Sequence, residues 1–211
     1  MGNLSKRWFA TIYGPIDRWQ RRSTAAIRRD LVGDLQGDIL DVGCGPGTNF
    51  EHYRPDAHVT AVDYNEHMLP MARKTLLGLR EPHAVIEVRQ ADAMALPFRD
   101  ASFDAYVSTL VLCSVPDLER AVEEAWRVLA PGGALRLFEH VRSEVPWKAR
   151  VQSALNPAWG LVADGCHLDR LTHHAFIERG FEVTEQRRVR MRAEPLPLVV
   201  LKARKPEQRS A

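Results

Sequence analysis

Short apolar runs alternate with amphipathic segments along most of the chain. Seven runs have the length and the content of apolar residues that are typical of strands. They cover residues 38–42, 58–63, 84–90, 105–112, 134–140, 181–190 and 198–204. Helical spacing predicts helices over 48–53, 65–79, 118–129 and 172–179, over 4–34 with a break at Gly14-Pro15, and over 146–162 with a break at Asn156-Pro157.

Strand and helix alternate over the first 140 residues, which predicts a parallel sheet with helices on both faces. The last two predicted strands are close in sequence and favour an antiparallel edge. Asp117 is expected to cap the helix over 118–129, and Pro131-Gly132-Gly133 to end it. We therefore expect an N-terminal helical cap over 1–35, one domain over 36–205 and a flexible tail over 206–211.

The strongest local signal is the glycine loop at 43–47, directly after the first predicted strand. Glycines allow a sharp turn and close approach to a ligand, although a plain strand–helix turn has the same pattern. A dinucleotide-binding loop has its third glycine one place later, where Thr48 stands. Asp63 and Asp92 each close a predicted strand, where carboxylates can accept hydrogen bonds from ribose hydroxyls and from an adenine amine. Together these features predict a nucleoside-type cofactor.

The loop Asp41–Gly47, Asp63, Asp92-Ala93 and Leu129–Gly133 resemble the successive motifs of class I S-adenosylmethionine (SAM)-dependent methyltransferases. The resemblance implies a Rossmann-like, seven-stranded sheet with one antiparallel strand. It also implies a set of cofactor-binding positions, among which Tyr64, Met68 and Met94 have ordinary core packing as their alternative. The predicted set is Asp41, Gly43, Gly45, Gly47, Asp63, Tyr64, Met68, Asp92, Ala93, Met94 and Thr109.

Three further stretches, 108–115, 138–141 and 156–168, resemble the methyltransferase-like 7 family, the alkyl thiol S-methyltransferases. That family often carries an N-terminal hydrophobic membrane anchor, a feature that this sequence lacks. The resemblance implies SAM-dependent methyl transfer to a small molecule, with a thiol as first choice. A phospholipid amine, a quinone or a natural-product scaffold is the alternative acceptor, and a SAM-binding protein without catalysis is a third interpretation.

A thiol acceptor has to lose its proton, because the thiolate is the nucleophile. His140 ends a predicted strand on the ligand side and is our candidate base, with a structural histidine as the alternative. Asp164 and His167 are predicted to bind substrate or to cap a helix, and Glu139 is a second acid of the site. Cys44 and Cys113 are interpreted as packing residues, and we expect no metal because neither His173-His174 nor any cysteine–histidine spacing suggests one.

The composition of the chain bears on its binding partners and its cellular location. The 211 residues carry a net charge of +2, which argues against a nucleic-acid binder. The lack of an Asn/Asp-Pro-Pro-aromatic sequence at Thr109–Val111 argues against an adenine-N6 or similar amino methyltransferase that acts on nucleic acid. Residues 1–29 hold seven basic residues against the single acid Asp17, so this helix either makes a weak membrane-surface contact, contacts an anionic substrate or packs on the domain. Three unpaired cysteines, the lack of a signal peptide and the lack of a membrane-spanning run predict a cytoplasmic protein.

Overall fold

We determined the architecture from a computed structural model that describes residues 21–162, 165–191 and 194–207. Most of the predicted N-terminal cap, the residue Asp164 and most of the predicted tail lie outside the described residues. Residues 21–32 are helical, in agreement with the pattern. In the part of the chain that is described, no helix is both long and apolar enough to span a bilayer.

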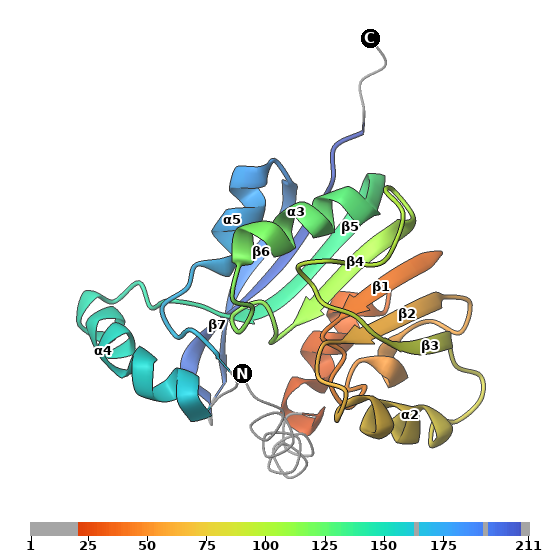
Figure 1. Ribbon diagram of the computed structural model, residues 1–211, viewed down its shortest axis with the longest axis horizontal. Coiled ribbons are helices and arrows are strands. Elements are labelled where there is room, and N and C mark those ends of the chain that lie inside the picture. Colours follow the sequence, from red (N-terminus) through yellow and green to blue (C-terminus); the bar gives the residue numbers. More distant parts are fainter. Residues whose placement is uncertain (1–20, 163–164, 192–193, 208–211) are drawn as a thin grey trace.

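Seven strands form one sheet in the order β3-β2-β1-β4-β5-β7-β6 (Figure 1). β7 runs antiparallel to both of its neighbours, whereas the other pairs are parallel. This confirms the Rossmann-like class I methyltransferase fold that the sequence predicts. The strands are β1 (Asp38–Val42), β2 (His58–Asp63), β3 (Val85–Gln90), β4 (Phe103–Thr109), β5 (Leu129–His140), β6 (Glu182–Met191) and β7 (Glu194–Arg204).

The strand order reverses between β1 and β4. The chain first builds outward from β1 through β2 to β3, and then crosses to the other side of β1 to form β4. Val42, the last residue of β1, is paired with Val62 of β2 and with Ser108 of β4. The loop after β1 therefore leaves the sheet at the topological switch point, where open α/β sheets bind ligands.

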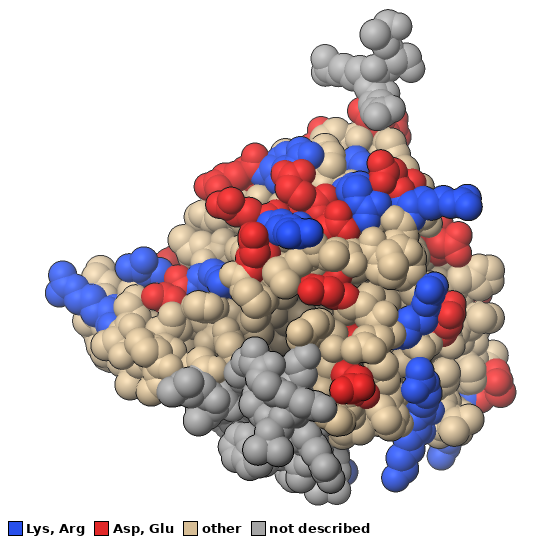
Figure 2. Space-filling view, in the orientation of Figure 1, with Lys and Arg blue, Asp and Glu red and all other residues tan. Residues whose placement is uncertain are grey.

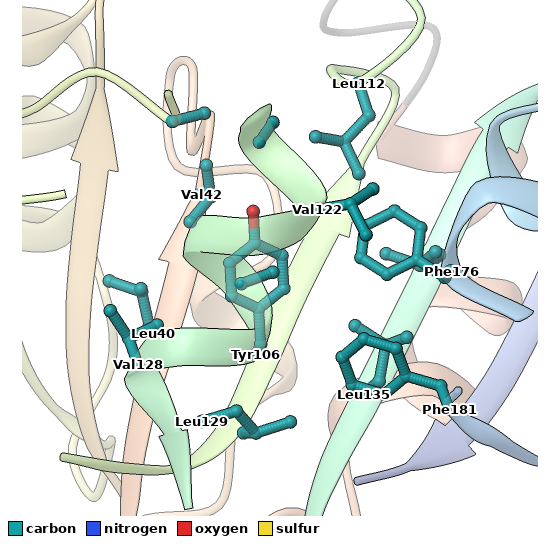
Figure 3. Close-up of a cluster of buried hydrophobic side chains, with 14 of the residues drawn as sticks. Leu40, Val42, Tyr106, Leu112, Val122, Val128, Leu129, Leu135, Phe176 and Phe181 are labelled. Atoms are coloured by element: carbon teal, nitrogen blue, oxygen red, sulfur yellow. The ribbon is translucent and has the colours of Figure 1, made fainter. Parts of the chain in front are cut away.

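Alternate residues of the central strands contribute side chains to two hydrophobic cores, one on each face of the sheet. Leu40 and Tyr106 point to the core under α3 (Leu118–Val128) and α5 (Thr172–Arg179) (Figure 3). On the other face, Ile39 packs with residues of the helix over 21–32 and of α2 (Leu69–Leu77). Both faces of these strands are buried, which explains their nearly continuous apolar sequence.

Two helix boundaries that the sequence predicts are confirmed. The Asp117 side chain accepts a hydrogen bond of 3.0 Å from the backbone N–H of Arg120 and caps α3. α5 ends at Gly180, which has a φ of 112° in the left-handed region.

Several predicted details are wrong. The strand expected over 105–112 ends at Thr109, because Leu110 has a φ of 61° and turns the chain. Pro131-Gly132-Gly133 does not end α3, which stops at Val128, but lies within β5. The helix expected over 48–53 is a single 3-10 turn at Phe50–His52, and the backbone is already extended at Tyr53. α4 (Pro146–Val162) continues through Asn156-Pro157, where a break was expected. β5 already begins at Leu129 rather than after Gly133, since Gly132 and Gly133 form backbone hydrogen bonds with Lys205 beyond β7.

Candidate active site

The glycine loop turns through three left-handed residues. Gly43, Gly45 and Gly47 have φ values of 69°, 53° and 78°. The Asp63 carboxylate fixes the loop to the end of β2, since one oxygen accepts a 2.8 Å hydrogen bond from the N–H of Gly45 and the other accepts one of 2.8 Å from the N–H of Asn65. The acid predicted to receive a ribose is thus already oriented by two backbone donors.

A cavity of about 260 Å³ opens between this loop and the ends of β2, β3 and β4. Its lining combines carboxylates at strand ends with apolar side chains, among them Val42, Leu110 and Val115. Nine of the eleven predicted cofactor residues line it: Gly43, Gly45, Asp63, Tyr64, Met68, Asp92, Ala93, Met94 and Thr109. The structure therefore brings together most of a site that the sequence spreads over 67 positions, from 43 to 109.

Asp41 and Gly47 do not line the cavity. The Asp41 carboxylate is 1% exposed and accepts hydrogen bonds of 3.2 and 3.1 Å from the side-chain amide of Asn49. Burial raises the pKa of Asp41 to about 6. A Cβ on Gly47 would lie 2.5 Å from the Phe50 ring, so this glycine serves packing behind the loop. Both residues support the cavity wall from behind.

Arg28 is a lining residue that sequence analysis missed. It is 3% exposed, and its guanidinium donates hydrogen bonds of 2.6 Å to Asn49 Oδ1 and 2.9 Å to Thr109 Oγ1. Arg21 of the same helix donates to the backbone carbonyl of Pro46 at 2.9 Å. Arg21 and Arg28 thus hold the helix against the glycine loop and β4. The net charge of this segment could not distinguish such a role from an exposed position on the surface.

The residues present fit an adenosyl sulfonium cofactor. A Cβ built on Gly45 would meet nothing within 4 Å, so the loop leaves open space on the cavity side. Asp63 and Asp92 place carboxylates at two strand ends of the same cavity, and Asp92 is oriented by a 2.9 Å hydrogen bond from the N–H of Met94. The buried Arg28 adds a cation at the switch point, suited to a ligand carboxylate.

The three predicted catalytic residues do not form one group. His140 lies at the end of β5 beside Cys113 and Cys166. His167 is instead directed at α4, where its Nδ1 is 3.3 Å from the Asn156 amide, while its backbone N–H donates to the carbonyl of Cys113. Asp164 lies outside the described residues. Of the three, His140 alone is placed by the structure in a cluster of ionisable side chains.

Cys113, His140 and Cys166 converge from three segments. Their ligating atoms lie within 4.8 Å of one another, and the two sulfurs are 3.5 Å apart. The contact with Cys113 lowers the pKa of Cys166 to about 5 and raises that of Cys113. The sequence favoured a packing role for Cys113 and offered no cysteine–histidine spacing that suggests a metal, whereas the structure brings these three side chains together. The signal in the sequence was that Cys113 follows β4 and that His140 ends the neighbouring strand β5.

Glu139 holds the segment that carries Cys113. Its carboxylate is 1% exposed and accepts hydrogen bonds from the Ser108 hydroxyl at 3.0 Å and from the backbone N–H groups of Val111 and Leu112. Burial raises the pKa of Glu139 despite these donors. Glu139 therefore orders the turn after β4, and its oxygens are already engaged.

Comparison with known proteins agrees with this geometry. A methyltransferase domain family matches residues 40–137. The human thiol S-methyltransferase TMT1A is 35% identical over 187 residues, which cover 84% of this chain and 77% of that protein. A phosphatidylethanolamine N-methyltransferase from Cereibacter sphaeroides is 34% identical over 185 residues, covering 86% and 87%. The structure of a SAM-dependent methyltransferase from Mesorhizobium loti superposes with a TM-score of 0.63 at 21% identity, covering 87% of this chain and 98% of that one.

The sheet order, the glycine loop and the acids at the strand ends define a class I SAM-dependent methyltransferase. Within this class, the chain belongs to the methyltransferase family that includes the human thiol S-methyltransferases TMT1A and TMT1B. The resemblance that the sequence motifs suggested is thereby confirmed.

Proposed function

We propose that this methyltransferase transfers the methyl group of SAM to a small thiol. The observation that carries the proposal is the segment after β4, which connects the two parts of the site. Leu110, Val111, Ser114 and Val115 line the cofactor cavity, while Cys113 belongs to the cluster with His140 and Cys166. The thiol S-methyltransferases named above, which share 30–35% identity with this chain, support the same acceptor.

Several residues would hold the cofactor. Asp63 would accept hydrogen bonds from the ribose hydroxyls and Asp92 from the adenine amine, whereas Tyr64, Met68 and Met94 would surround the nucleoside. The glycine loop and Arg28 would contact the methionine part. When bound, the cofactor supplies an electrophilic methyl group on a positively charged sulfur.

The apolar lining favours the reaction by excluding water. Val42, Leu110 and Val115 border the cavity where the loop meets β4. A thiolate and a sulfonium neutralise each other in the transition state, so a low-dielectric wall leaves less charge to be solvated. Alignment of donor and acceptor by the cavity supplies much of the remaining acceleration. Deprotonation of the thiol is the remaining chemical requirement, and we assign it to the region of His140.

Incubation of the protein with SAM and a panel of small thiols, amines and phenols tests the proposal. We expect methyl thioethers together with S-adenosylhomocysteine, both measured by mass spectrometry. An Asp63→Ala variant should weaken SAM binding strongly, since it removes the acceptor for the ribose and a contact of the loop. SAM binding without methylation of any thiol would refute the acceptor. Absence of S-adenosylhomocysteine with every acceptor would instead indicate a binding protein.

A second candidate is a lipophilic acceptor such as a phospholipid amine, a quinone or a natural-product scaffold. It is favoured by α4, where Trp147, Val151 and Leu155 are 63%, 47% and 55% exposed at helical spacing. The surface over α4 is largely uncharged, with basic side chains at its outer end (Figure 2). The similarity to a phosphatidylethanolamine N-methyltransferase points the same way.

Flotation with vesicles that contain anionic lipid separates the two candidates. A lipophilic acceptor predicts co-flotation at low salt through the exposed apolar side chains of α4, and loss of co-flotation in a Trp147→Ser/Leu155→Ser variant. Protein that stays at the bottom of the gradient while it methylates a water-soluble thiol would leave the thiol as the acceptor.

A further inference from the structure

We propose that Cys113, His140 and Cys166 form a binding site for a zinc-type divalent metal ion, with an open position for the acceptor thiol. The metal site itself rests on geometry alone. Its use in thiol activation also rests on the proposed function, so the experiments below separate the two.

The spacing of the three side chains is that of metal ligands. A tetrahedral zinc ion, with zinc–sulfur distances of about 2.3 Å and zinc–nitrogen distances of about 2.0 Å, separates its ligand atoms by roughly 3.5–3.8 Å. The sulfurs of Cys113 and Cys166 are 3.5 Å apart, and all three ligand atoms lie within 4.8 Å of one another. This sulfur–sulfur distance is too long for a disulfide, which has a bond of about 2.05 Å. Two thiolates and an imidazole are ligands that zinc prefers.

The cluster is built into the fold by its surroundings. Glu139 accepts from the backbone before Cys113, and the N–H of His167 donates to the Cys113 carbonyl at 2.9 Å. Gln152 of α4 donates to the carbonyls of Val141 and Leu168, one residue past His140 and two residues past Cys166. Hydrogen bonds of this kind fix each ligand segment before a metal arrives, as outer-shell contacts do in known metal sites.

The number of ligands points to a reactive site. Structural zinc sites are closed by four protein ligands, whereas catalytic sites have three and keep one position open. Within the part of the chain that the structure describes, the group consists of three residues. None of the three ligands lines the cofactor cavity itself, but Cys113 directly precedes Ser114 and Val115, which do, and we therefore assign the open position to the side of the methyl donor.

The chemistry balances without a further reactant. An acceptor thiol that occupies the open position loses its proton to water and remains as a metal-bound thiolate. Its sulfur electron pair forms the new bond to the methyl carbon, while the carbon–sulfonium bond breaks and returns its electrons to the cofactor sulfur. Both products are neutral thioethers, which are weaker ligands than thiolates and therefore leave. In this scheme His140 is a metal ligand rather than a base.

Metal analysis of the full chain tests the site. Protein purified under reductant from zinc-supplemented cells should carry about one zinc ion per chain. Cys113→Ser, Cys166→Ser and His140→Gln should each reduce the zinc content at least about tenfold. Cys44→Ser and His174→Gln are matched controls, since both lie outside the cluster and should retain zinc. Metal-free wild-type protein, or equal zinc loss in the controls, would overturn the site.

Cobalt substitution gives a readout that needs no variant to fold. Wild-type protein loaded with Co²⁺ should show thiolate-to-cobalt charge-transfer absorption. If intact mass spectrometry of protein kept under reductant shows a mass lower by two hydrogens, then Cys113 and Cys166 form a disulfide and the metal site is refuted.

The role in activation has its own outcomes. Addition of a small thiol without SAM should change the visible spectrum of the cobalt protein, and an unchanged spectrum would refute the open position. Undiminished thiol methylation by metal-free protein would refute metal activation while it supports the proposed function. Failure to methylate any thiol with metal bound would refute the proposed function and leave the metal site standing.

Discussion

Gly43 and Gly45 both have left-handed backbone but differ in their surroundings. A Cβ on Gly43 would lie 2.3 Å from the Val111 side chain, whose backbone is fixed by Glu139. The same atom on Gly45 would meet nothing within 4 Å and would project into space bordered by the cavity. The first glycine therefore serves packing, and the second serves ligand access.

Alanine at these two positions should separate stability from binding. Gly43→Ala should lower the free energy of unfolding by roughly 2–4 kcal/mol, which is the sum of the backbone strain of a left-handed alanine and of the clash between its methyl group and the Val111 side chain. Gly45→Ala should cost about 1 kcal/mol of stability yet weaken SAM binding more than any other loop change, because the methyl group occupies ligand space. Chemical denaturation and calorimetric titration measure the two effects. Equal stability losses with unchanged SAM affinity in Gly45→Ala would contradict this division.

His173 should make the protein sensitive to acid. Its side chain is buried, and neither ring nitrogen has a hydrogen-bond partner among the described residues. Burial lowers the pKa of His173 from 6.5 to about 4. Because the unfolded chain takes up this proton near pH 6.5, stability falls between about pH 6.5 and 4, by up to roughly 3 kcal/mol.

A His173→Leu variant removes that proton uptake. The melting temperature of the variant, measured by circular dichroism, should exceed that of the wild type by more at pH 4.5 than at pH 7.5. His174→Gln removes a neighbouring charge that also lowers the pKa of His173, so it should reduce the difference between the two pH values, but by less than His173→Leu does. A melting difference that does not depend on pH would show that His173 is not held neutral.

At the scale of elements, the helix over 21–32 is part of the cofactor site. Arg28 connects this helix to Asn49 and to Thr109 on β4. Burial raises the pKa of Asp41, and the nearby charge of Arg28 partly opposes that rise. The loop after β1 and the end of β4 are thereby joined through one guanidinium. The helix thus acts as a wall of the cavity rather than as a detached cap.

Replacement of Arg28 tests this wall. Arg28→Ala should weaken SAM binding about 10–100-fold, the equivalent of roughly 1.5–3 kcal/mol for charged hydrogen bonds. Arg28→Lys should recover less than the full affinity, because it keeps the charge but loses the planar fork. The adjacent, exposed Arg29→Ala is the control and should bind SAM as wild type does in calorimetric titration. Equal affinities for Arg28→Ala and Arg29→Ala would remove the helix from the site.

Sequence patterns predict those elements whose environment is uniform. β1 and β2 have the predicted bounds because both faces are buried, so apolar runs mark them clearly. The predicted break in α4 was wrong. Pro157 removes only one helical hydrogen bond, and a tertiary contact holds the helix at this point, since the Asn156 side chain accepts a 2.8 Å hydrogen bond from the N–H of Leu168. Tertiary contacts of this kind leave no periodic signal.

The residues of the candidate site likewise fall into those that strand prediction places and those that only the folded structure places. The glycine loop directly follows β1, Asp63 ends β2 and Asp92 comes two residues after β3, so strand prediction alone brings them to one edge of the sheet. Arg28 and Cys166 enter from helical and loop segments whose position depends on packing against the sheet. Their participation follows from the folded structure and could not be read from spacing along the chain.

At the scale of the whole molecule, the cavity takes its walls from both halves of the sheet. The β1–β3 half supplies the glycine loop, Asp63 and Asp92, and the half that begins with β4 supplies the segment 109–116. A ligand in this cavity should therefore restrict the motion of both halves of the sheet at once. It also stabilises the folded state by about 2.7 kcal/mol when its free concentration is 100 times the dissociation constant.

Hydrogen exchange with S-adenosylhomocysteine should show this coupling directly. We expect slower amide exchange in the helix over 21–32, in 43–49 and 63–65, and equally in 91–94 and 109–116, because these segments border one cavity. β6, at the edge of the sheet farthest from β3, should exchange at the same rate with and without the ligand. Protection of the β1–β3 segments alone would mean that the ligand does not cross the switch point. In that case the segment after β4 could not present an acceptor to the methyl donor, and the division of the site between the two halves would have to be abandoned.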